Sequence, residues 1–476
     1  MRVRTRFAPS PTGFMHVGNL RTGLYAFLFA KQHQGDFIVR IEDTDLDRYV
    51  EGAVDVIYQT LKTSGITIDE GPNEGGPYGP YVQSERKPIY MEYAKKLVAT
   101  QAAYYCFCTK ERLDQLSDDK GIKKYDKHCL HLSEEEIKKH LDNHDPFVIR
   151  QNIPLDGVSE FDDLVFGHVA IENKELEDQV LIKSDGMPTY NFANVVDDHL
   201  MHISHVIRGN EYLSSTPKYN LLYKAFGWET PQYMHLTPIM KDETRKLSKR
   251  YGDANFDDFI RKGYLPQAII NYIALLGWSP KENREKFSME ELIERFSITG
   301  LSKSSGIFDE MKMKWLNGEY IKELDFNTFM HLATPFFEES LIRGRYDYAK
   351  FGKLLQSRIE IFSEIPEKVN FITQFERFNP ALYENKKLKI DQELARKVIV
   401  TSLSELTALP IWNEEQLHQA VVRIATTIEA KTGQVYTVLR VALTGVVVTP
   451  GGSVEMADIL GRDEALRRLK CSLEWL

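Results

Sequence analysis

Residues 2–41 read RVRTRFAPSPTGFMHVGNLRTGLYAFLFAKQHQGDFIVRI, and this stretch decides the fold. Residues 2–8 are predicted to form a short strand, and residues 9–13 are a Pro- and Gly-containing cluster that interrupts regular structure. A helix is predicted to follow, with Asn19 at its beginning and Gly35 at its end. The apolar residues that recur on one face of this helix are Leu20, Leu24, Phe27 and Leu28.

Residues 37–41 are compact and rich in β-branched side chains, so they are predicted to form a second strand. A strand, a crossover helix and a second strand together predict a parallel βαβ unit. Ligands of such sheets bind at the carboxyl ends of the strands. A ligand is therefore expected to meet the loop of residues 9–19.

The remainder of the chain continues this α/β pattern and then becomes helical. Apolar runs near 163–170 and 178–183 resemble strands, and residues 187–212 resemble a further helix and strand of the first sheet. From about residue 255 the apolar period is helical. The segments predicted from this pattern are 1–85, 86–187, 188–240, 241–325 and 326–476, with 86–187 inserted between two halves of one nucleotide-binding domain.

Composition is that of a globular protein. The chain has 476 residues, 27% charged and 42% hydrophobic, with a net charge of −9 and only four cysteines, which excludes a disulfide-rich secreted scaffold. No uncharged apolar stretch reaches about 18 residues, and the N-terminus lacks the apolar core of a signal peptide. We therefore expect a cytoplasmic protein with no membrane partner.

The net negative charge does not exclude nucleic acid as a partner, because total charge averages over all faces of a protein. Residues 341–400 carry twelve basic and eight acidic side chains. Two interpretations stay open for this segment: a solvated helical surface, or a local face that binds phosphates.

Two separate segments suit phosphate binding. In the loop after the first strand, Gly18 permits close backbone approach, His16 can donate to a phosphoryl oxygen, and the helix beginning at Asn19 favours an anion. The loop is neither the dinucleotide fingerprint nor a Walker P-loop. Far along the chain, Lys246-Leu247-Ser248-Lys249-Arg250 places two lysines three apart, where they can meet charge on a transferring phosphate.

Together these segments resemble the HIGH and KMSKS signatures of class I aminoacyl-tRNA synthetases. Within that class, the sequence is most similar to the glutamyl-tRNA synthetases. The resemblance covers nearly the whole chain. The HIGH-like motif departs from its full form, because Asn19 stands where the family's last His is found. The matching segments are residues 6–22, 40–45, 188–199, 206–209, 246–250, 263–266, 315–317 and 440–445.

The resemblance implies a Rossmann-like parallel-sheet catalytic domain with an inserted acceptor-binding domain, a stem-contact region and an all-helical C-terminal anticodon-binding region. It implies a monomeric ligase that attaches L-glutamate to tRNA(Glu) through a glutamyl-adenylate, using ATP and Mg²⁺. An enzyme that also glutamylates tRNA(Gln) is the alternative. By motif, the catalytic residues are His16, Lys246 and Lys249, and the ATP-binding residues are Pro9, His16, Gly18, Asn19, Lys246, Ser248 and Lys249.

Glutamate has two carboxylates and one ammonium, so its site needs cations and at least one anion. Arginine is preferred for a carboxylate because its planar fork makes two-point contacts. Carried over by motif, Arg6 and Arg208 are the cations and Glu42 is the partner of the amino group. The full set of glutamate-binding residues implied by the resemblance is Arg6, Ala8, Ser10, Glu42, Tyr190, Asn194 and Arg208.

Three cysteines and a histidine form the order Cys106-Phe107-Cys108 and Cys129-Leu130-His131. From spacing alone, a tetrahedral zinc site and three reduced cysteines beside an exposed histidine are both open. Some members of the resembled family carry zinc with this order of ligands. The resemblance therefore implies one structural Zn²⁺ per chain on Cys106, Cys108, Cys129 and His131, with Tyr125 and His128 as other candidates.

The length and motifs of the chain argue against four other classes of protein. A small nucleotidyltransferase needs no helical region of some 150 residues, and a non-catalytic descendant of a synthetase would have lost His16, Lys249 or Arg208. A glutamyl-queuosine enzyme lacks the anticodon-binding part. A glutaminyl-tRNA synthetase would carry a C-terminal β-barrel, whereas here the period is helical.

Overall fold

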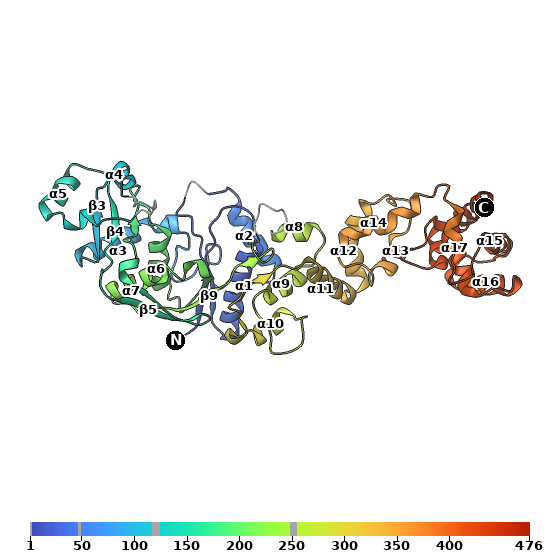
Figure 1. Ribbon diagram of the computed structural model, residues 1–476, viewed down its shortest axis with the longest axis horizontal. Coiled ribbons are helices and arrows are strands. Elements are labelled where there is room, and N and C mark those ends of the chain that lie inside the picture. The colour runs from blue at the N-terminus through green and yellow to red at the C-terminus, as the bar shows by residue number, and fades with distance from the viewer. Residues whose placement is uncertain (1, 46–48, 117–123, 248–254) are drawn as a thin grey trace. The chain divides into compact units, whose positions relative to one another are not determined.

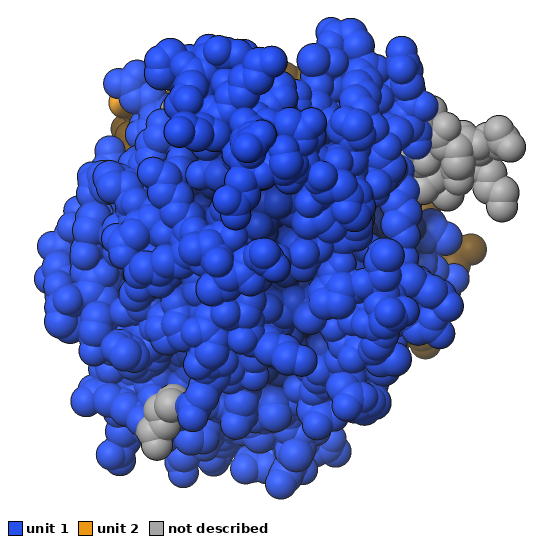
Figure 2. Space-filling model, turned by 90° about the vertical axis from the view of Figure 1, so that its left-hand side faces the viewer, with its two compact units in different colours: residues 1–261, 266–310 blue, residues 262–265, 311–476 orange. Residues whose placement is uncertain are grey.

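A computed structural model describes residues 2–45, 49–116, 124–247 and 255–476 (Figure 1). The chain divides into two compact units, blue and orange in Figure 2: unit 1 is residues 1–261 and 266–310, and unit 2 is residues 262–265 and 311–476. The predicted segment 241–325 spans the boundary between the two units at residue 310, and the five predicted segments stay predictions. No described helix is both long and apolar enough to cross a bilayer.

Unit 1 begins with the predicted βαβ element, which confirms the α/β fold. Strand β1 (Arg4–Phe7) is parallel to β2 (Asp36–Val39), and Arg4 pairs with Asp36 in register. Helix α1 (Val17–Gln32) crosses between the strands and contacts both. Its apolar face, including Leu20, Leu24 and Leu28, is fully buried against them, which is why the helical period was visible in the sequence.

The beginning of α1 differs from the sequence expectation. The helix begins at Val17 rather than Asn19, because the His16 side chain caps it by accepting a hydrogen bond from the Gly18 amide. Val17 is fully buried and so belongs to the packed part of the helix. Sequence patterns place helix ends poorly when the cap is not one of the usual small polar residues.

The second half of the sheet is built from later strands. Strand β8 (His205–Gly209) is parallel to β9 (Gln232–Leu236), and the Ser204 amide donates to the Arg4 carbonyl, which places β8 beside β1. Strands β5 (Val158–Asp163) and β6 (Gly167–Glu172) form a hairpin whose β5 end pairs with β9 in parallel. The order β6-β5-β9-β8 brings the C-terminal ends of β5, β9 and β8 to one edge.

An antiparallel sheet of three strands lies within the predicted insertion: β3 (Ala103–Cys106), β4 (Val148–Gln151) and β7 (Val180–Ile182). A core shared by this sheet and three helices surrounds Phe192 and Tyr219. The helices are α3 (Lys87–Ala99), α6 (Tyr190–Leu200) and α7 (Thr216–Phe226). The predicted helix and strand of residues 187–212 are thus present as α6 and β8. The shorter helical elements here are η2 (Gln83–Arg86), α4 (Lys110–Asp114), η3 (His128–His131), α5 (Glu134–Asp142), η4 (Asn173–Glu175) and η5 (Asn210–Tyr212).

The rest of unit 1 is mainly helical, and strands β10 (Ile239–Met240) and β11 (Gly306–Ile307) pair in parallel. Its helices are α2 (Ala53–Thr63), α8 (Phe256–Arg261), α9 (Pro266–Leu275), α10 (Met289–Arg295) and η7 (Ile298–Gly300). Helix α11 (Glu310–Glu323) begins at the last residue of unit 1 and continues into unit 2.

The described residues of unit 2 form helices and no strand, as the helical period of the sequence predicted. After α11 the elements are α12 (Phe326–Glu338), α13 (Tyr348–Leu355), η8 (Phe362–Glu364), α14 (Ile365–Asn370), η9 (Phe371–Thr373), η10 (Pro380–Tyr383), α15 (Gln392–Thr407), α16 (Glu414–Thr427), α17 (Thr432–Thr444), α18 (Ser453–Leu460) and α19 (Arg462–Trp475).

Candidate active site

The histidine of the first phosphate-binding segment sits at the N-cap of α1. Its Nδ1 accepts a hydrogen bond from the Gly18 amide at 3.0 Å. A neutral imidazole that accepts at Nδ1 carries its proton on Nε2. His16 therefore presents a donor at Nε2, beside a helix N-terminus that favours an anion.

The neighbouring residues of this loop are held close to the second strand. The Pro9 carbonyl accepts from the Glu42 amide at 3.1 Å, so the loop follows the chain that continues from β2. A Cβ on Gly18 would lie 3.1 Å from Nδ1 of His16 and would press on the cap. Asn19 is exposed in the first turn of α1.

Only part of the second phosphate-binding segment can be placed. Lys246 is exposed and pairs with Met240 in a short antiparallel bridge. The turn before it is closed by Asp242, whose carboxylate accepts from the Thr244 and Arg245 amides. Ser248 and Lys249, which the motif also assigns to ATP, lie outside the described residues.

A buried network of alternating charges lies behind the loop. Arg6 donates to both carboxylate oxygens of Asp198 at 3.1 and 3.2 Å, and Arg40 donates to Asp198 at 2.8 Å and to Oε1 of Glu42 at 2.9 Å. Burial alone would raise the pKa of Asp198, but the Arg6 and Arg40 charges hold it below its ordinary value. The charge of Arg6 is thus already balanced inside the protein.

Glu42 is almost fully buried and retains one unused oxygen. Its Oε1 accepts from Arg40, while no described residue donates a hydrogen bond to Oε2. Burial raises the pKa of Glu42 despite the neighbouring Arg40 and Arg6 charges. The remaining oxygen suits an incoming ammonium group, because a bound cation would favour the ionised carboxylate.

Unlike Arg6, Arg208 is a buried cation of this site that has no ion pair with a described carboxylate. Its Nε donates to Nε2 of His235 at 3.1 Å and its Nη2 donates to the Thr216 hydroxyl at 2.7 Å. Both partners are neutral groups, and Arg208 makes no ion pair with a described carboxylate. Three aromatic rings surround the guanidinium at 4.8 to 5.5 Å: Tyr212, Tyr219 and Tyr233.

The other predicted glutamate contacts lie around these charges. Tyr190 and Asn194 are one turn apart on α6, and Asn194 donates to the Tyr190 carbonyl at 2.8 Å. Burial raises the pKa of Tyr190, which also interacts electrostatically with Glu42, Arg208 and Arg6, so these side chains share one region. Ala8 and the exposed Ser10 follow directly after β1, at its C-terminal end.

Several residues of this site were not singled out from the sequence. Arg40 and Asp198 stood within matching segments, but only the fold reveals that they neutralise Arg6 and contact Glu42. Asp163 and His235 lie outside every segment that matched the family, so the sequence motifs did not mark them. A charged residue within a predicted strand is the pattern that could have indicated Asp163.

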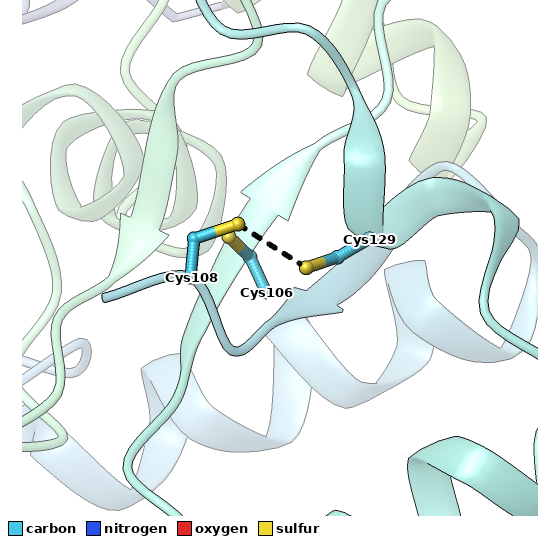
Figure 3. A group of neighbouring side chains, drawn as sticks. All are labelled: Cys106, Cys108 and Cys129. Carbon is cyan, nitrogen blue, oxygen red and sulfur yellow. Dashed lines mark hydrogen bonds between the residues drawn. The ribbon is translucent and has the colours of Figure 1, made fainter. Parts of the chain in front are cut away.

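The three cysteines of the predicted metal site converge (Figure 3). Their sulfurs lie within 4.8 Å of one another, with Cys106 at the end of β3, Cys108 in the following loop and Cys129 in η3. The Cys129 thiol, followed by the Tyr125 hydroxyl, lowers the pKa of Cys106 to about 4 against the opposing effect of burial. Sulfur donors in a buried cluster fit Zn²⁺.

In the described structure the Tyr125 hydroxyl lies beside the thiols, and the predicted fourth ligand, His131, stays a prediction. The Tyr125 hydroxyl lies 3.3 Å from Sγ of Cys106 and 3.5 Å from Sγ of Cys108. His131 is exposed and is not part of the group of ligand atoms that the described chain brings within 4.8 Å. The Arg150 guanidinium lies 4.2 Å over the Tyr125 ring, and Arg112 donates to Cys108, so positive charge faces the thiols.

Comparisons with known proteins cover the whole chain. The family model described as tRNA synthetases class I (E and Q), catalytic domain, matches residues 2–315, and the anticodon binding domain model matches residues 328–473. The chain is 54% identical to the glutamate–tRNA ligase of Clostridium novyi over 477 residues, covering 100% of this chain and 98% of that protein. It is also 54% identical to the glutamate–tRNA ligase of Clostridium tetani over 479 residues, with the same coverage.

Solved structures give the same result. A glutamate tRNA ligase from Elizabethkingia meningosepticum, crystallised in complex with its amino acid, superposes with a TM-score of 0.90 at 35% identity, covering 100% of this chain and 99% of that one. The glutamate-tRNA synthetase of Elizabethkingia anophelis superposes with a TM-score of 0.91 at 35% identity, with full coverage of both chains.

Proposed function

The chain belongs to the class I tRNA synthetases of the glutamate and glutamine type, and on that premise we propose that it attaches L-glutamate to tRNA(Glu) with ATP. Two chemical steps are required. The α-carboxylate of glutamate attacks the α-phosphate of ATP, which gives glutamyl-adenylate and releases pyrophosphate. A terminal ribose hydroxyl of the tRNA then attacks the activated carbonyl, which forms the ester and releases AMP.

The first step depends on positioning and charge neutralisation more than on a protein nucleophile. His16 would donate from Nε2 to a phosphoryl oxygen, and the Gly18–Asn19 turn of α1 would bring the backbone close to the phosphates. Pro9 would shape the wall of the ATP site. Lys246, Ser248 and Lys249 would contact the phosphates from the second segment, where a lysine charge matters most as the α-phosphate is attacked.

The observation in the structure that carries the substrate assignment is the buried, uncompensated guanidinium of Arg208. Arg6 and Arg40 share the Asp198 carboxylate, whereas Arg208 has no described carboxylate partner, so Arg208 would be the main cation for a glutamate carboxylate, with Arg6 as the second predicted cation. Glu42 would bind the amino group through its second oxygen. Tyr190, Asn194, Ala8 and Ser10 would complete the pocket by hydrogen bonds and shape.

ATP would bind together with Mg²⁺. Mg²⁺ is commonly held by substrate phosphates with few protein ligands. Among the described residues the cysteine cluster is the one group of three or more metal-ligand side chains in close contact, so no carboxylate cage is ready-made for Mg²⁺. The protein's part would be to orient the phosphates through His16 and Lys246. The match of unit 2 to the anticodon binding domain supports a tRNA contact there.

Aminoacylation of separately purified tRNAs tests this function. The wild-type chain is incubated with ATP, Mg²⁺ and radiolabelled glutamate or glutamine, with tRNA(Glu) and tRNA(Gln) in parallel. We expect label from glutamate on tRNA(Glu) and none from glutamine. Absence of tRNA-linked glutamate would reject the function, and efficient labelling of tRNA(Gln) with glutamate would establish the broader specificity instead.

We further propose that the cysteine cluster holds one structural Zn²⁺. The observation that supports it is the convergence of three sulfurs, two of them on buried residues, with a tyrosine hydroxyl and two nearby arginines. Bound zinc would replace the weak contacts between thiols and so stabilise the region between β3 and η3. Cys106, Cys108 and Cys129 would supply three ligands, and the fourth would come from His131 or from Tyr125, whose hydroxyl lies 3.3 Å from Sγ of Cys106.

Zinc content and ligand identity are measured on protein purified without chelator. We expect about one Zn per chain by elemental analysis, in keeping with a closed structural site. Tyr125→Phe and His131→Ala are then compared during dialysis against a competing chelator, and the variant that loses zinc faster identifies the fourth ligand. Zinc-free protein would favour reduced cysteines.

A further inference from the structure

We propose that Asp163 and His235 act together as positioning residues that fix the Arg208 guanidinium while leaving its charge available to the substrate. This inference rests on the proposed function, because it concerns how the glutamate carboxylate is recognised. It adds two residues that no sequence motif marked. Their role would be to act through Arg208 rather than to touch the substrate.

The sheet brings the three residues together from distant parts of the chain. Asp163 is the last residue of β5, His235 lies in β9 and Arg208 lies in β8. Arg208 and His235 are register partners across the parallel β8–β9 pair, and Asp163 pairs with Tyr233 on the other side of β9. The Asp163 and His235 side chains are completely buried. The alignment is therefore a property of three adjacent strands.

The hydrogen bonds fix the proton positions in this set. A guanidinium can only donate, so Nε2 of His235 must accept from Arg208 Nε at 3.1 Å. The proton of the neutral imidazole is then on Nδ1, which donates to Oδ2 of Asp163 at 2.6 Å. Asp163 is itself fixed, because its Oδ1 accepts from the amides of Val165 at 2.9 Å and Phe166 at 2.8 Å. Its Oδ2 also accepts from the His235 amide at 3.1 Å.

Because the His235 imidazole is neutral, it can orient the Arg208 guanidinium without neutralising its charge. Burial lowers the pKa of His235, and the adjacent Arg208 lowers it further against the effect of Asp163, so the ring facing Arg208 is neutral at neutral pH. In contrast, Asp198 contacts Arg6 directly and neutralises it. With Nε held by His235 and Nη2 held by Thr216, the Nη1 group makes no hydrogen bond with a described residue and is available to a carboxylate.

Asp163→Asn tests the pair, because either orientation of the new amide is unfavourable. An NH₂ group facing His235 opposes the Nδ1 proton and forces the ring toward the other tautomer, whose Nε2 proton opposes Arg208 Nε. An NH₂ group facing Val165 and Phe166 opposes two backbone donors. We expect KM for glutamate to rise about ten- to a hundredfold, the usual effect of losing a supporting partner, with KM for ATP unchanged. Glutamine has an amide in place of the side-chain carboxylate. The ratio of kcat/KM for glutamate to kcat/KM for glutamine should therefore fall in parallel.

Asp162→Asn is the matched control, because Asp162 is the preceding residue of β5 and its side chain is exposed. It should leave both KM values unchanged. A second pair, His235→Gln and His235→Leu, covers the case in which Asp163→Asn does not fold. A glutamine oxygen can still accept from Arg208 Nε, whereas leucine cannot. Values of kcat/KM for glutamate should therefore fall in the order wild type, Gln variant, Leu variant.

The outcomes separate this inference from the proposed function. A wild-type chain that does not charge tRNA rejects the function itself. An active wild type with an Asp163→Asn variant of normal KM for glutamate rejects the pair alone. Equal rises in KM for glutamate and ATP, or loss of the folded state in all three variants, would assign Asp163 and His235 to structure instead.

Discussion

At the scale of single residues, the two candidate arginines of the substrate site differ in their partners rather than in their burial. Arg6 and Arg208 are both almost fully buried. Arg6 lies against a carboxylate, while Arg208 lies against an imidazole, a hydroxyl and three aromatic rings. A buried charge is costly unless it is paired, so Arg208 is a cation kept ready for an anionic ligand.

Arg208→Lys should therefore not be a conservative change. A lysine has one compact head group and cannot contact His235, Thr216 and a carboxylate with separate donors. We expect KM for glutamate to rise by about tenfold or more with KM for ATP unchanged, measured by steady-state aminoacylation. The exposed Arg2→Lys is the control for a general effect of the exchange. Wild-type glutamate kinetics in Arg208→Lys would remove Arg208 from the pocket.

At the scale of secondary structure, the N-terminus of α1 combines two roles in one side chain. His16 caps the helix through Nδ1, which leaves the proton on Nε2, the atom that would donate to phosphate in the proposed function. Asparagine is also a good N-cap residue, but its side chain is shorter and has no group in the place of Nε2. The two roles can thus be separated by one substitution.

His16→Asn should preserve helix α1 but reduce catalytic activity. We expect the free energy of unfolding to change by less than ~0.5 kcal/mol, because the cap is conserved, and kcat to fall by about 10²–10³, as for loss of one electrostatic contact to the transition state. Thermal unfolding and single-turnover aminoacylation measure the two effects. His33→Asn at the other end of α1 is the control. A marked loss of stability with normal kcat would make His16 a structural cap only.

Helix α19 is tied to the rest of unit 2 by a buried arginine. Arg468 donates to the carbonyls of Leu443, near the end of α17, and of Ile372 in η9, at 2.9 and 2.6 Å. The neighbouring Arg467 pairs with the same Glu464 but is largely exposed. The two arginines therefore make a natural comparison of buried and surface ion pairs.

Arg468→Met should destabilise unit 2 by roughly 1–3 kcal/mol for each buried carbonyl left without a donor. Arg467→Met should cost at most about 1 kcal/mol, since surface ion pairs contribute little. Hydrogen exchange in α17 and α19 of the full-length chain measures both variants. Equal loss of protection in the two would mean that the Leu443 and Ile372 contacts do not stabilise the helix.

At the scale of the whole molecule, unit 1 contains buried or partly buried histidines whose protonation is unfavourable. Burial lowers the pKa of His199, His205 and His235. The unfolded chain titrates these residues near the ordinary value of about 6.5 and so binds protons that the folded state rejects. The stability contributed by keeping these histidines neutral is therefore fully present above about pH 6.5 and decreases as the pH falls below that value.

We expect the thermal unfolding midpoint of the wild-type chain to decrease as the pH is lowered from about 7.5 to about 5.5. Ordinary carboxylates titrate below this range. His199→Phe should reduce this dependence, because it removes one of the three groups while an aromatic ring can still stack on Trp228, as the imidazole does at 3.7 Å. Scanning calorimetry at several pH values measures the slope. A midpoint that rises on acidification would contradict the assignment of these histidines as neutral in the folded state.

Local structure and functional motifs could be predicted from the amino-acid sequence. A compact β-branched run and the helical apolar period predicted the first βαβ unit and the helical C-terminal region, because burial of one face of a helix leaves its period in the sequence. Parallel-sheet topology then predicted that the loop after β1 meets the ligand. Ordered motifs, including His16 and Arg208, indicated the family that the comparisons confirmed.

The pairing of these residues could not be predicted from the sequence and became visible in the folded chain. Contacts of Arg6 with Asp198, of Arg208 with His235 and of His235 with Asp163 join positions far apart in the chain, and their alignment depends on strand register. The cysteine cluster shows the same limit, since Tyr125 reaches the sulfurs while the more obvious His131 is exposed. Short-range patterns record which face is buried, but the identity of the partner across that face depends on how the sheet and helices pack.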